Sequence, residues 1–460
     1  MLLGKSLLQL KELVDTKKTS AKEVADFFLN RIKKYNTQLN AFLTVSDQIT
    51  ATETGLFSGL PLAVKDNFCI KGMRTTASSK VLENFISPYE STVTSRLKNA
   101  GAAILGKTNM DAWAHGSSTE TSDYGPTKNP WDISRSPGGS SGGTAAAVSA
   151  YLAPAGIGSE TAGSIRQPAA WSGIVGLKPT YGRVPRYGVI AMGSSLDCPG
   201  PMTNTVEDAA FILKSIAGKD PYDATSSPQP VADYSSLMKK NRKLKIGISE
   251  DYFKGLDKGT EKRLNEALEV FKKMGHSVAK VKLLSPQYSI SVYTILQRAE
   301  VSSNLSRYDG IRYGNDRTTF GAEAKRRIML GTYTLSYGYY DAFYKKAQKV
   351  RTLIIENFKS VFKEVDVIVA PTTPVAALKL GEFEKYPFFG EMMDVMNEPG
   401  AMAGIPAINI PVGLEDNNLP VGLQIMGNYF DEGTILDLAY QFEKETEFFG
   451  VIKKGIENYV

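Results

Sequence analysis

Histidine is scarce in this chain of 460 residues, which contains only His115 and His276. A serine hydrolase with a histidine base needs one of them beside its nucleophile, and a zinc hydrolase usually needs two or three histidines together. His276 lies between a predicted helix and a predicted strand, which favours a surface or capping position. His115 lies nearer to glycines and serines, in "DAWAHGSSTE". The chain therefore has little histidine from which to build a catalytic base.

Cysteine and long apolar runs are equally scarce. Two cysteines, Cys69 and Cys198, without a CxxC pair, indicate a reducing compartment, and we expect a cytoplasmic protein. The first residues alternate apolar and charged positions and lack the unbroken apolar core of a signal peptide. No run of about 18 apolar residues occurs, so no membrane span is expected.

Charge of one sign does not dominate the sequence either. The net charge is +6, and no block of lysine and arginine stands out. This balance permits contact with nucleic acid without favouring it. With 42% hydrophobic and 22% charged residues, the composition is that of an ordinary soluble globular protein.

Strand-like and helix-like segments alternate along most of the chain. Residues 5–36 are predicted to be helical, with Ser20 and Glu23 forming a capping box. From about residue 60, short apolar strands and glycine turns alternate with helical stretches, which is the pattern of an α/β layered sheet. The stretch 218–234 is the best candidate for a loop or linker.

The second half of the chain continues this alternation. Residues 241–283 predict one strand-helix-strand unit, and residues 320–360 are mostly helical. Buried strands are expected again between residues 365 and 427, followed by a final helix near 432–445.

Two glycine-flanked serine clusters lie in "PGGSSGGTAAAVSAYLAPAGIGSETAGSIRQPAA", residues 137–170. A phosphate-binding loop would need GxxxxGK[ST] or GxGxxG, and neither is present. "GSETAGS" could bind an anion through its backbone amides, but a serine nucleophile held on glycine-rich backbone is the better interpretation. Such a nucleophile needs a base.

Lysine is the natural substitute for histidine, provided that burial lowers its pKa enough to leave it neutral part of the time. Lys65 follows apolar residues in "LPLAVKDN". Taken alone, it is typical of an outward-facing strand lysine. The serine clusters favour the role of a base.

These segments, with the tail "GSIRQPAAWSGIVGLKPTYGRV", resemble the amidase signature family. The resemblance implies a catalytic triad of Lys65, Ser140 with an unusual cis peptide, and Ser164 as nucleophile. It also implies an α/β fold with a large mixed central sheet covered by helices on both faces. We expect a single domain over 1–460, with a helical segment at about 1–50.

Within that domain the catalytic core is expected at about 55–215, and the substrate-site and C-terminal part at about 240–460. Polar residues near the lysine strand are expected to be structural hydrogen-bond partners; these are Asp66, Asn67, Asn109 and Asp111.

The triad supports a coherent chemistry. Neutral Lys65 takes a proton from Ser140 while Ser140 takes one from Ser164, and Ser164 attacks the amide carbonyl to form an acyl-enzyme. Backbone amides would stabilise the oxyanion; they belong to Thr161, Ala162, Gly163 and Ser164. Ala162 stands where the family usually has glycine, which would cost about 1–2 kcal/mol if that position needed a positive φ. Glu160 stands where the family usually has aspartate.

The segments "AEVSSNLSRYDGIRYG" and "KRRIMLGTYTLSYGYYDAFYKKAQKVRTL" resemble the A subunits of tRNA-dependent amidotransferases, and this resemblance covers nearly the whole chain. That resemblance implies a pocket for free glutamine, with Arg327 on the α-carboxylate, Asp394 on the α-ammonium and Tyr293 as a further contact. Arginine suits a carboxylate through two-point hydrogen bonding. Taken alone, Arg327 is typical of a solvated helix face, Asp394 of a loop and Tyr293 of a half-buried helix position.

The same resemblance implies partners and cofactors. We expect B and C subunits, with tRNA, ATP and Mg²⁺ bound mainly by the B subunit, and no cofactor or metal in this chain. Two alternatives remain open: a stand-alone hydrolase of aryl or alkyl amides, esters or carbamates, and a catalytically inactive scaffold. Glutamine, asparagine or a simple amide could each be the preferred substrate.

Overall fold

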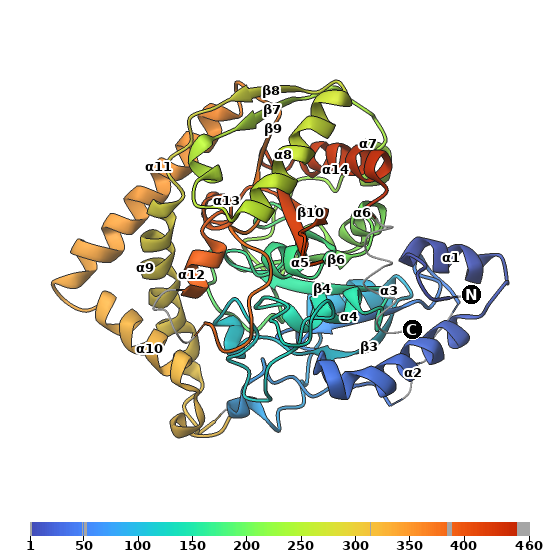
Figure 1. Ribbon diagram of the computed structural model, residues 1–460. Helices are drawn as coiled ribbons and strands as arrows, with labels where there is room; N and C mark the ends of the chain where they lie inside the picture. Colours follow the sequence, from blue (N-terminus) through green and yellow to red (C-terminus); the bar gives the residue numbers. More distant parts are fainter. Residues whose placement is uncertain (1, 48, 50–52, 313, 384–388, 449–460) are drawn as a thin grey trace.

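One mixed sheet runs through the protein (Figure 1). The computed structural model describes the chain except residues 1, 48, 50–52, 313, 384–388 and 449–460. In the described part, 11 strands pair in the order β1-β3-β2-β4-β6-β5-β10-β11-β9-β7-β8. Their bounds are β1 Phe42–Val45, β2 Pro61–Lys65, β3 Ala103–Thr108, β4 Ala155–Glu160, β5 Val175–Lys178, β6 Cys198–Thr203, β7 Lys245–Ile248, β8 Ser277–Lys280, β9 Val367–Pro371, β10 Ala407–Leu414 and β11 Pro420–Gly427.

Helices follow or precede most strands. The α-helices are α1 Leu7–Asp15, α2 Ala21–Leu39, α3 Thr92–Asn99, α4 Gly142–Ser149, α5 Arg166–Trp171, α6 Val206–Ile216, α7 Tyr234–Leu237, α8 Lys258–Lys273, α9 Gln287–Asn304, α10 Ala322–Thr334, α11 Lys346–Val361, α12 Phe389–Asp394, α13 Glu398–Ala403 and α14 Glu432–Thr446. Short 3₁₀ turns occur at Lys80–Leu82, Ala112–Ala114, Glu250–Phe253, Leu305–Arg307 and Arg317–Thr319, and a π-helical turn at Tyr340–Lys345.

The sheet is mixed and covered on both faces, which confirms the predicted fold class. β2 runs parallel to β3 and β4, whereas β4 and β6 are antiparallel. Every residue of β2, β4, β9 and β11 is buried. Because successive strand side chains point to opposite faces, complete burial means that helices or loops cover both faces. The edge strands β1 and β8 are more exposed.

The helix predicted over residues 5–36 is in fact two helices. α1 ends at Asp15, and Lys17 has a φ of 58°, which a continuing helix does not allow. The Ser20 hydroxyl then accepts from the Glu23 N–H while the Glu23 carboxylate accepts from the Ser20 N–H, as the capping box predicts.

Other element predictions are confirmed. β7, α8 and β8 form the predicted strand-helix-strand unit, with β7 and β8 parallel. The stretch 218–234 contains no helix or strand until α7 begins at Tyr234. The predicted helical region 320–360 contains α10 and α11, which project from the body at the left of Figure 1. Strands from both ends of the chain share the sheet, and the predicted domain bounds stay predictions.

Candidate active site

Lys65 is the last residue of β2, and its side chain is fully buried rather than outward-facing. Its Nζ donates to Ser140 Oγ at 2.7 Å and to the Ser159 carbonyl oxygen at 3.0 Å. Burial lowers the pKa of Lys65 from its usual 10.5 to about 7, although the carboxylates of Asp111, Asp197 and Glu160 act in the opposite direction. A neutral amine that can accept a proton is therefore available near pH 7.

Ser140 lies in the glycine-rich turn that leads into α4. The Gly139–Ser140 peptide bond is cis. Gly139 has no room for a side chain, because a Cβ there would overlap Asp111 Oδ2. The same Asp111 carboxylate accepts from the Thr119 N–H at 2.8 Å. Asp111 therefore shapes the turn as a structural partner, as the sequence predicted.

Ser164 lies on the loop between β4 and α5, and only 5% of it is exposed. The Ser141 N–H donates to the Ser164 carbonyl oxygen at 3.2 Å, which joins the two serine segments. The structure describes both Ser140 and Ser164 but shows no hydrogen bond between their hydroxyls. The second link of the proton relay therefore stays a prediction.

Glu160 fixes the shape of the Ser164 loop. Its carboxylate accepts from the backbone N–H groups of Ile165 at 3.1 Å and Arg166 at 3.2 Å, and pairs with the Arg166 guanidinium in full burial. It thus satisfies free amides at the start of α5. The neighbouring Ala162 does not have a positive φ, so its methyl group introduces no backbone strain. The two departures from the family pattern therefore fit the loop.

Tyr293 and Arg327 lie on two helices that pack against each other, α9 and α10. The Tyr293 hydroxyl is 2.8 Å from Thr161 Oγ1, on the predicted oxyanion loop. Arg327 is buried and pairs with Glu323 at 2.6 Å, whereas Lys325 and Arg326 in the same basic run are exposed. The solvated-face interpretation of Arg327 is thus wrong, because α10 packs this side of the helix against α9.

Asp394 ends α12 and lies against the oxyanion loop. A Cβ on Gly163 would overlap Asp394 Oδ1, so glycine is required there by close approach. The Ser117 hydroxyl donates to Asp394 Oδ2 at 2.7 Å, while Oδ1 is buried without a partner. Burial, with Glu160 and other carboxylates nearby, raises the pKa of Asp394 to about 7.

Several charged groups near these residues were missed by sequence reasoning. Arg298 on α9 pairs with Glu391 on α12 at 2.6 Å, and both side chains are buried. Glu398, the first residue of α13, is fully buried. No motif marks these residues. Only the packing of helices α9, α12 and α13 in the folded protein brings them together.

The predictions for the histidines had mixed outcomes. His276 is buried, not on the surface, and its Nδ1 accepts from the Leu244 N–H at 3.1 Å, which is a capping role. His115 is fully buried, and burial lowers its pKa well below the usual value. Neither histidine hydrogen-bonds to Ser140 or Ser164 in the described part of the chain.

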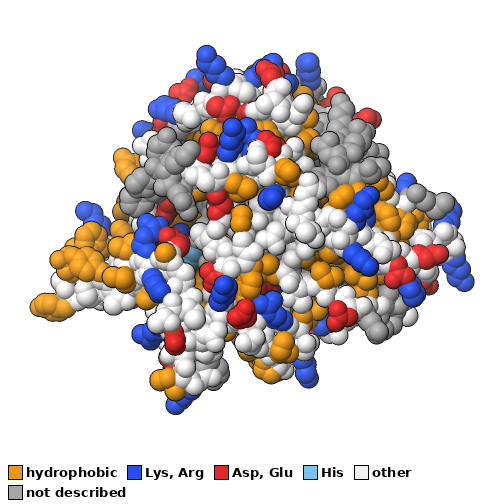
Figure 2. Space-filling model, turned by 60° about the horizontal axis from the view of Figure 1, so that its bottom comes forward, with side chains coloured by type: hydrophobic (Ala, Val, Ile, Leu, Met, Phe, Trp, Pro, Cys, Tyr) orange, Lys and Arg blue, Asp and Glu red, His pale blue; other side chains and the backbone are white. Residues whose placement is uncertain are grey.

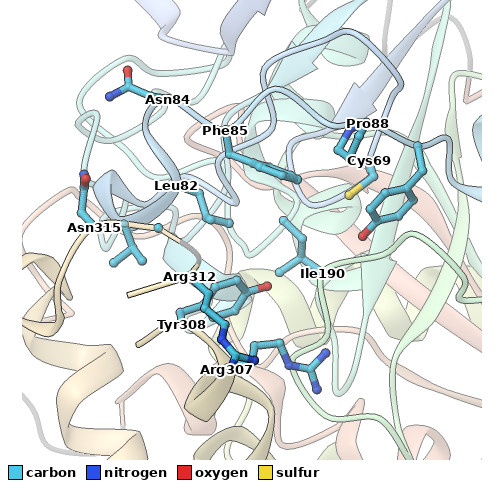
Figure 3. Close-up of a pocket in the computed structure, with 13 residues that line it drawn as sticks. Cys69, Leu82, Asn84, Phe85, Pro88, Ile190, Arg307, Tyr308, Arg312 and Asn315 are labelled. Atoms are coloured by element: carbon cyan, nitrogen blue, oxygen red, sulfur yellow. The ribbon is translucent and has the colours of Figure 1, made fainter. Parts of the chain in front are cut away.

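A cavity of about 700 Å³ lies apart from these residues. Figure 3 shows Tyr308, Arg307 and Arg312 on one side of it and Phe85 on the other. The predicted site residues do not line it. Within the described part of the chain, no cluster of three or more His, Cys, Asp or Glu side chains could hold a metal ion, and no helix is both long and apolar enough to cross a bilayer.

The buried lysine Lys65 is thus hydrogen-bonded to Ser140, and the adjacent Ser141 joins that segment to the loop that carries Ser164. The family described as Amidase matches residues 23–436, and the chain belongs to it. The A subunit of glutamyl-tRNA(Gln) amidotransferase from Halothermothrix orenii is 49% identical over 459 residues, covering 95% of this chain and 96% of that protein.

Solved structures agree with this assignment. The crystal structure of the A subunit of glutamyl-tRNA(Gln) amidotransferase from Thermotoga maritima is 41% identical, with a TM-score of 0.86, and the match covers 96% of this chain and 94% of that one. The native peptide amidase from Stenotrophomonas maltophilia is 29% identical, with a TM-score of 0.83, over 96% and 97% of the two chains.

Proposed function

We propose that this chain hydrolyses glutamine as the A subunit of a tRNA-dependent amidotransferase, with Lys65, Ser140 and Ser164 as its catalytic triad. The observation that carries this proposal is the buried Lys65 amine, with a pKa of about 7, hydrogen-bonded to Ser140 beside the Ser164 loop. Similarity to the amidotransferase A subunits of Halothermothrix orenii and Thermotoga maritima, over nearly the whole of each chain, supports the choice of glutamine.

The proposed reaction begins with proton transfer. Ser140 gives its proton to neutral Lys65 and takes the proton of Ser164, whose oxygen attacks the side-chain amide carbon of glutamine. Backbone N–H groups of the loop 161–164 hold the oxygen that becomes negative. As the C–N bond breaks, the proton on Lys65 returns through Ser140 to the nitrogen, and ammonia leaves. The product on Ser164 is a glutamyl ester.

Water then completes the cycle through the same relay. Its proton passes through Ser140 to Lys65 as its oxygen attacks the ester carbon, and the proton returns to Ser164 when glutamate is released. The ammonia passes to a partner that amidates Glu-tRNA(Gln) or Asp-tRNA(Asn). We propose B and C subunits as partners, with ATP, Mg²⁺ and the acceptor tRNA held mainly by the B subunit.

An exposed apolar surface supports the proposal that the chain works in a complex. At the tip of the α10–α11 projection, orange side chains gather in Figure 2. Large hydrophobic residues are exposed there, with Tyr337 fully so; the others include Met329, Tyr333, Tyr340 and Phe343. Contiguous apolar surface of this kind is typical of a contact with another protein.

The test measures ammonia release from L-glutamine by the chain with its proposed partner subunits, and follows the acyl-enzyme by mass spectrometry. We expect a glutamyl adduct on Ser164 after brief exposure to glutamine. Turnover of a neutral aryl amide without any turnover of glutamine would instead favour a stand-alone amidase. The similarity to a peptide amidase is the observation that favours testing this second function.

A further inference from the structure

The cavity of about 700 Å³ shown in Figure 3 has no role in the proposed reaction. None of the predicted site residues lines it. Its volume is in the range of pockets that hold small organic molecules. Such pockets combine a mostly apolar lining with a few polar groups that fix the ligand, so the chemistry of the walls indicates the class of ligand.

One wall of the cavity is apolar. Val81 and Leu82 belong to the 3₁₀ turn Lys80–Leu82, and both side chains are buried. Phe85 and Ile190 extend this wall in Figure 3. The aromatic ring and the branched apolar side chains favour a ligand whose body is an apolar ring.

The opposite wall carries two positive charges. Arg307 follows α9, and Arg312 lies on the loop after it. Figure 3 shows both guanidinium groups beside Tyr308. Arg307 Nη2 makes one long hydrogen bond, to Asn304 Oδ1 at 3.4 Å. Among the described residues, neither arginine forms an ion pair with a carboxylate.

Asp309 is the acidic residue that lies between the two arginines in the sequence. Its Oδ1 accepts from the backbone N–H groups of Ile311 at 2.8 Å and Arg312 at 3.1 Å, so this carboxylate holds the turn. The guanidinium groups of Arg307 and Arg312 stay available to a ligand. Guanidinium binds carboxylate and phosphate groups through paired hydrogen bonds, so the polar end of the ligand should be an anion.

The two walls are fixed relative to each other. The Tyr308 ring packs against the buried Trp113, with 4.8 Å between the ring centroids. The Asn315 N–H donates to the Val81 carbonyl oxygen at 2.8 Å, and Asn315 Nδ2 donates to the Lys80 carbonyl oxygen at 2.8 Å. The loop that carries the arginine wall is thus attached to the turn that forms the apolar wall, and the cavity exists before a ligand binds.

We propose that this cavity is a second binding site, which takes a small organic anion with an apolar ring. Arg307 and Arg312 hold its carboxylate or phosphate group. Phe85, Leu82 and Ile190 pack against its ring. The inference goes beyond the proposed hydrolysis and does not depend on it, because the site shares no residue with the predicted amidase site.

The first experiment compares three probes that share one ring system. Isothermal titration calorimetry of the full chain measures the binding of 2-naphthoate, 2-naphthyl phosphate and the neutral 2-naphthamide. We expect the better anion to bind with a dissociation constant at or below about 1 mM, which is usual for a ligand of this size. The amide should bind at least about fivefold more weakly, and salt raised from about 0.05 M to about 0.5 M should weaken only the anions.

Arginine variants then locate the probe. Arg307→Gln and Arg312→Gln should each weaken 2-naphthoate roughly fivefold, as expected for an ion pair at a partly exposed site. The double variant should bind 2-naphthoate no better than 2-naphthamide. Arg317→Gln is the matched control, because Arg317 is exposed on the next turn and does not line the cavity, and it should change no affinity.

A further variant tests the apolar wall. Phe85→Ala should weaken all three probes by a similar factor of about tenfold, since it removes the ring contact and no charge. The thermal unfolding midpoint checks that this variant is folded, and the arginine variants, which change exposed side chains, do not depend on that result.

Three results would overturn the inference. They are equal affinities for 2-naphthoate and 2-naphthamide, unchanged 2-naphthoate binding in the double arginine variant, and no binding of either anion. The arginine variants should also keep amide hydrolysis within about twofold of the unmodified protein, and a parallel loss of hydrolysis and probe binding would contradict a separate site. A protein without glutamine hydrolysis would overturn the proposed function, whereas the probe affinities would still decide this inference.

Discussion

At the scale of single residues, the proposed chemistry depends on the protonation state of Lys65. Its pKa of about 7 means that protonation as pH falls below 7 removes the base, while the amine is fully neutral well above 7. We therefore expect kcat/KM to fall about tenfold per pH unit below that value and to level off above it. A pH–rate profile between pH 5 and 9 checks this, and a flat profile would remove Lys65 from the relay.

Replacement of Lys65 should be equally informative. Lys65→Met removes the base, and Lys65→Arg replaces it with a group that stays protonated at any working pH. Both variants should lose roughly 10²- to 10⁴-fold in kcat, which is the usual contribution of a positioned acid–base group. An arginine variant with near-normal activity would contradict the assignment.

Ser164 is the residue whose loss should be complete. Ser164→Ala removes the attacking oxygen but leaves the loop intact, since Glu160 still accepts from the amides of Ile165 and Arg166. We expect no measurable adduct by mass spectrometry and an unchanged thermal unfolding midpoint. Residual turnover within tenfold of the unmodified protein would contradict a nucleophilic role.

At the scale of elements, the β4–α5 loop sets the distance between Ser164 and Asp394, the residue predicted to bind the substrate α-ammonium. Gly163→Ala would force the new methyl group against Asp394, so α12 or the loop must shift. A misplacement of this size near the reacting groups can cost about 100-fold in rate. We expect at least that loss for glutamine in Gly163→Ala, measured as kcat/KM.

Ala162→Gly is the matched control for this loop. Ala162 does not have a positive φ, so glycine brings no relief of strain. We expect kcat/KM to stay within a few-fold. A large gain in kcat/KM in Ala162→Gly, or a normal kcat/KM in Gly163→Ala, would contradict the loop geometry described above.

The sequence predicted elements well where the signal was local. The capping box at Ser20, the β7–α8–β8 unit and the loop 218–234 all depend on neighbours in the chain. The break between α1 and α2 was missed because the left-handed residue there is Lys17, and no glycine or proline marks the position in the sequence. The Lys65–Ser140 contact could be predicted because family motifs fix both positions.

At the scale of the whole molecule, the predicted substrate pocket combines segments that are far apart in sequence. Thr161 lies on the β4–α5 loop, Tyr293 on α9 and Asp394 on α12. The Arg298–Glu391 pair and the buried Glu398 could not be predicted, since only tertiary packing brings their charges together. Local pattern reasoning even favoured a solvated Arg327, because burial by a distant helix leaves no local signal.

The assembled pocket yields a test that separates glutamine from simple amides. Arg327 and Asp394 are expected on the α-carboxylate and α-ammonium, groups that a neutral aryl amide lacks. A hydrogen bond to a charged group contributes about 1.5–3 kcal/mol, so Arg327→Met and Asp394→Asn should each lower glutamine kcat/KM by roughly 10- to 150-fold. Aryl-amide hydrolysis should stay within a few-fold. Arg326→Met, an exposed neighbour on the same helix, is the control and should change neither substrate. Equal losses on both substrates would mean that Arg327 and Asp394 support the fold of the site rather than bind the amino-acid head.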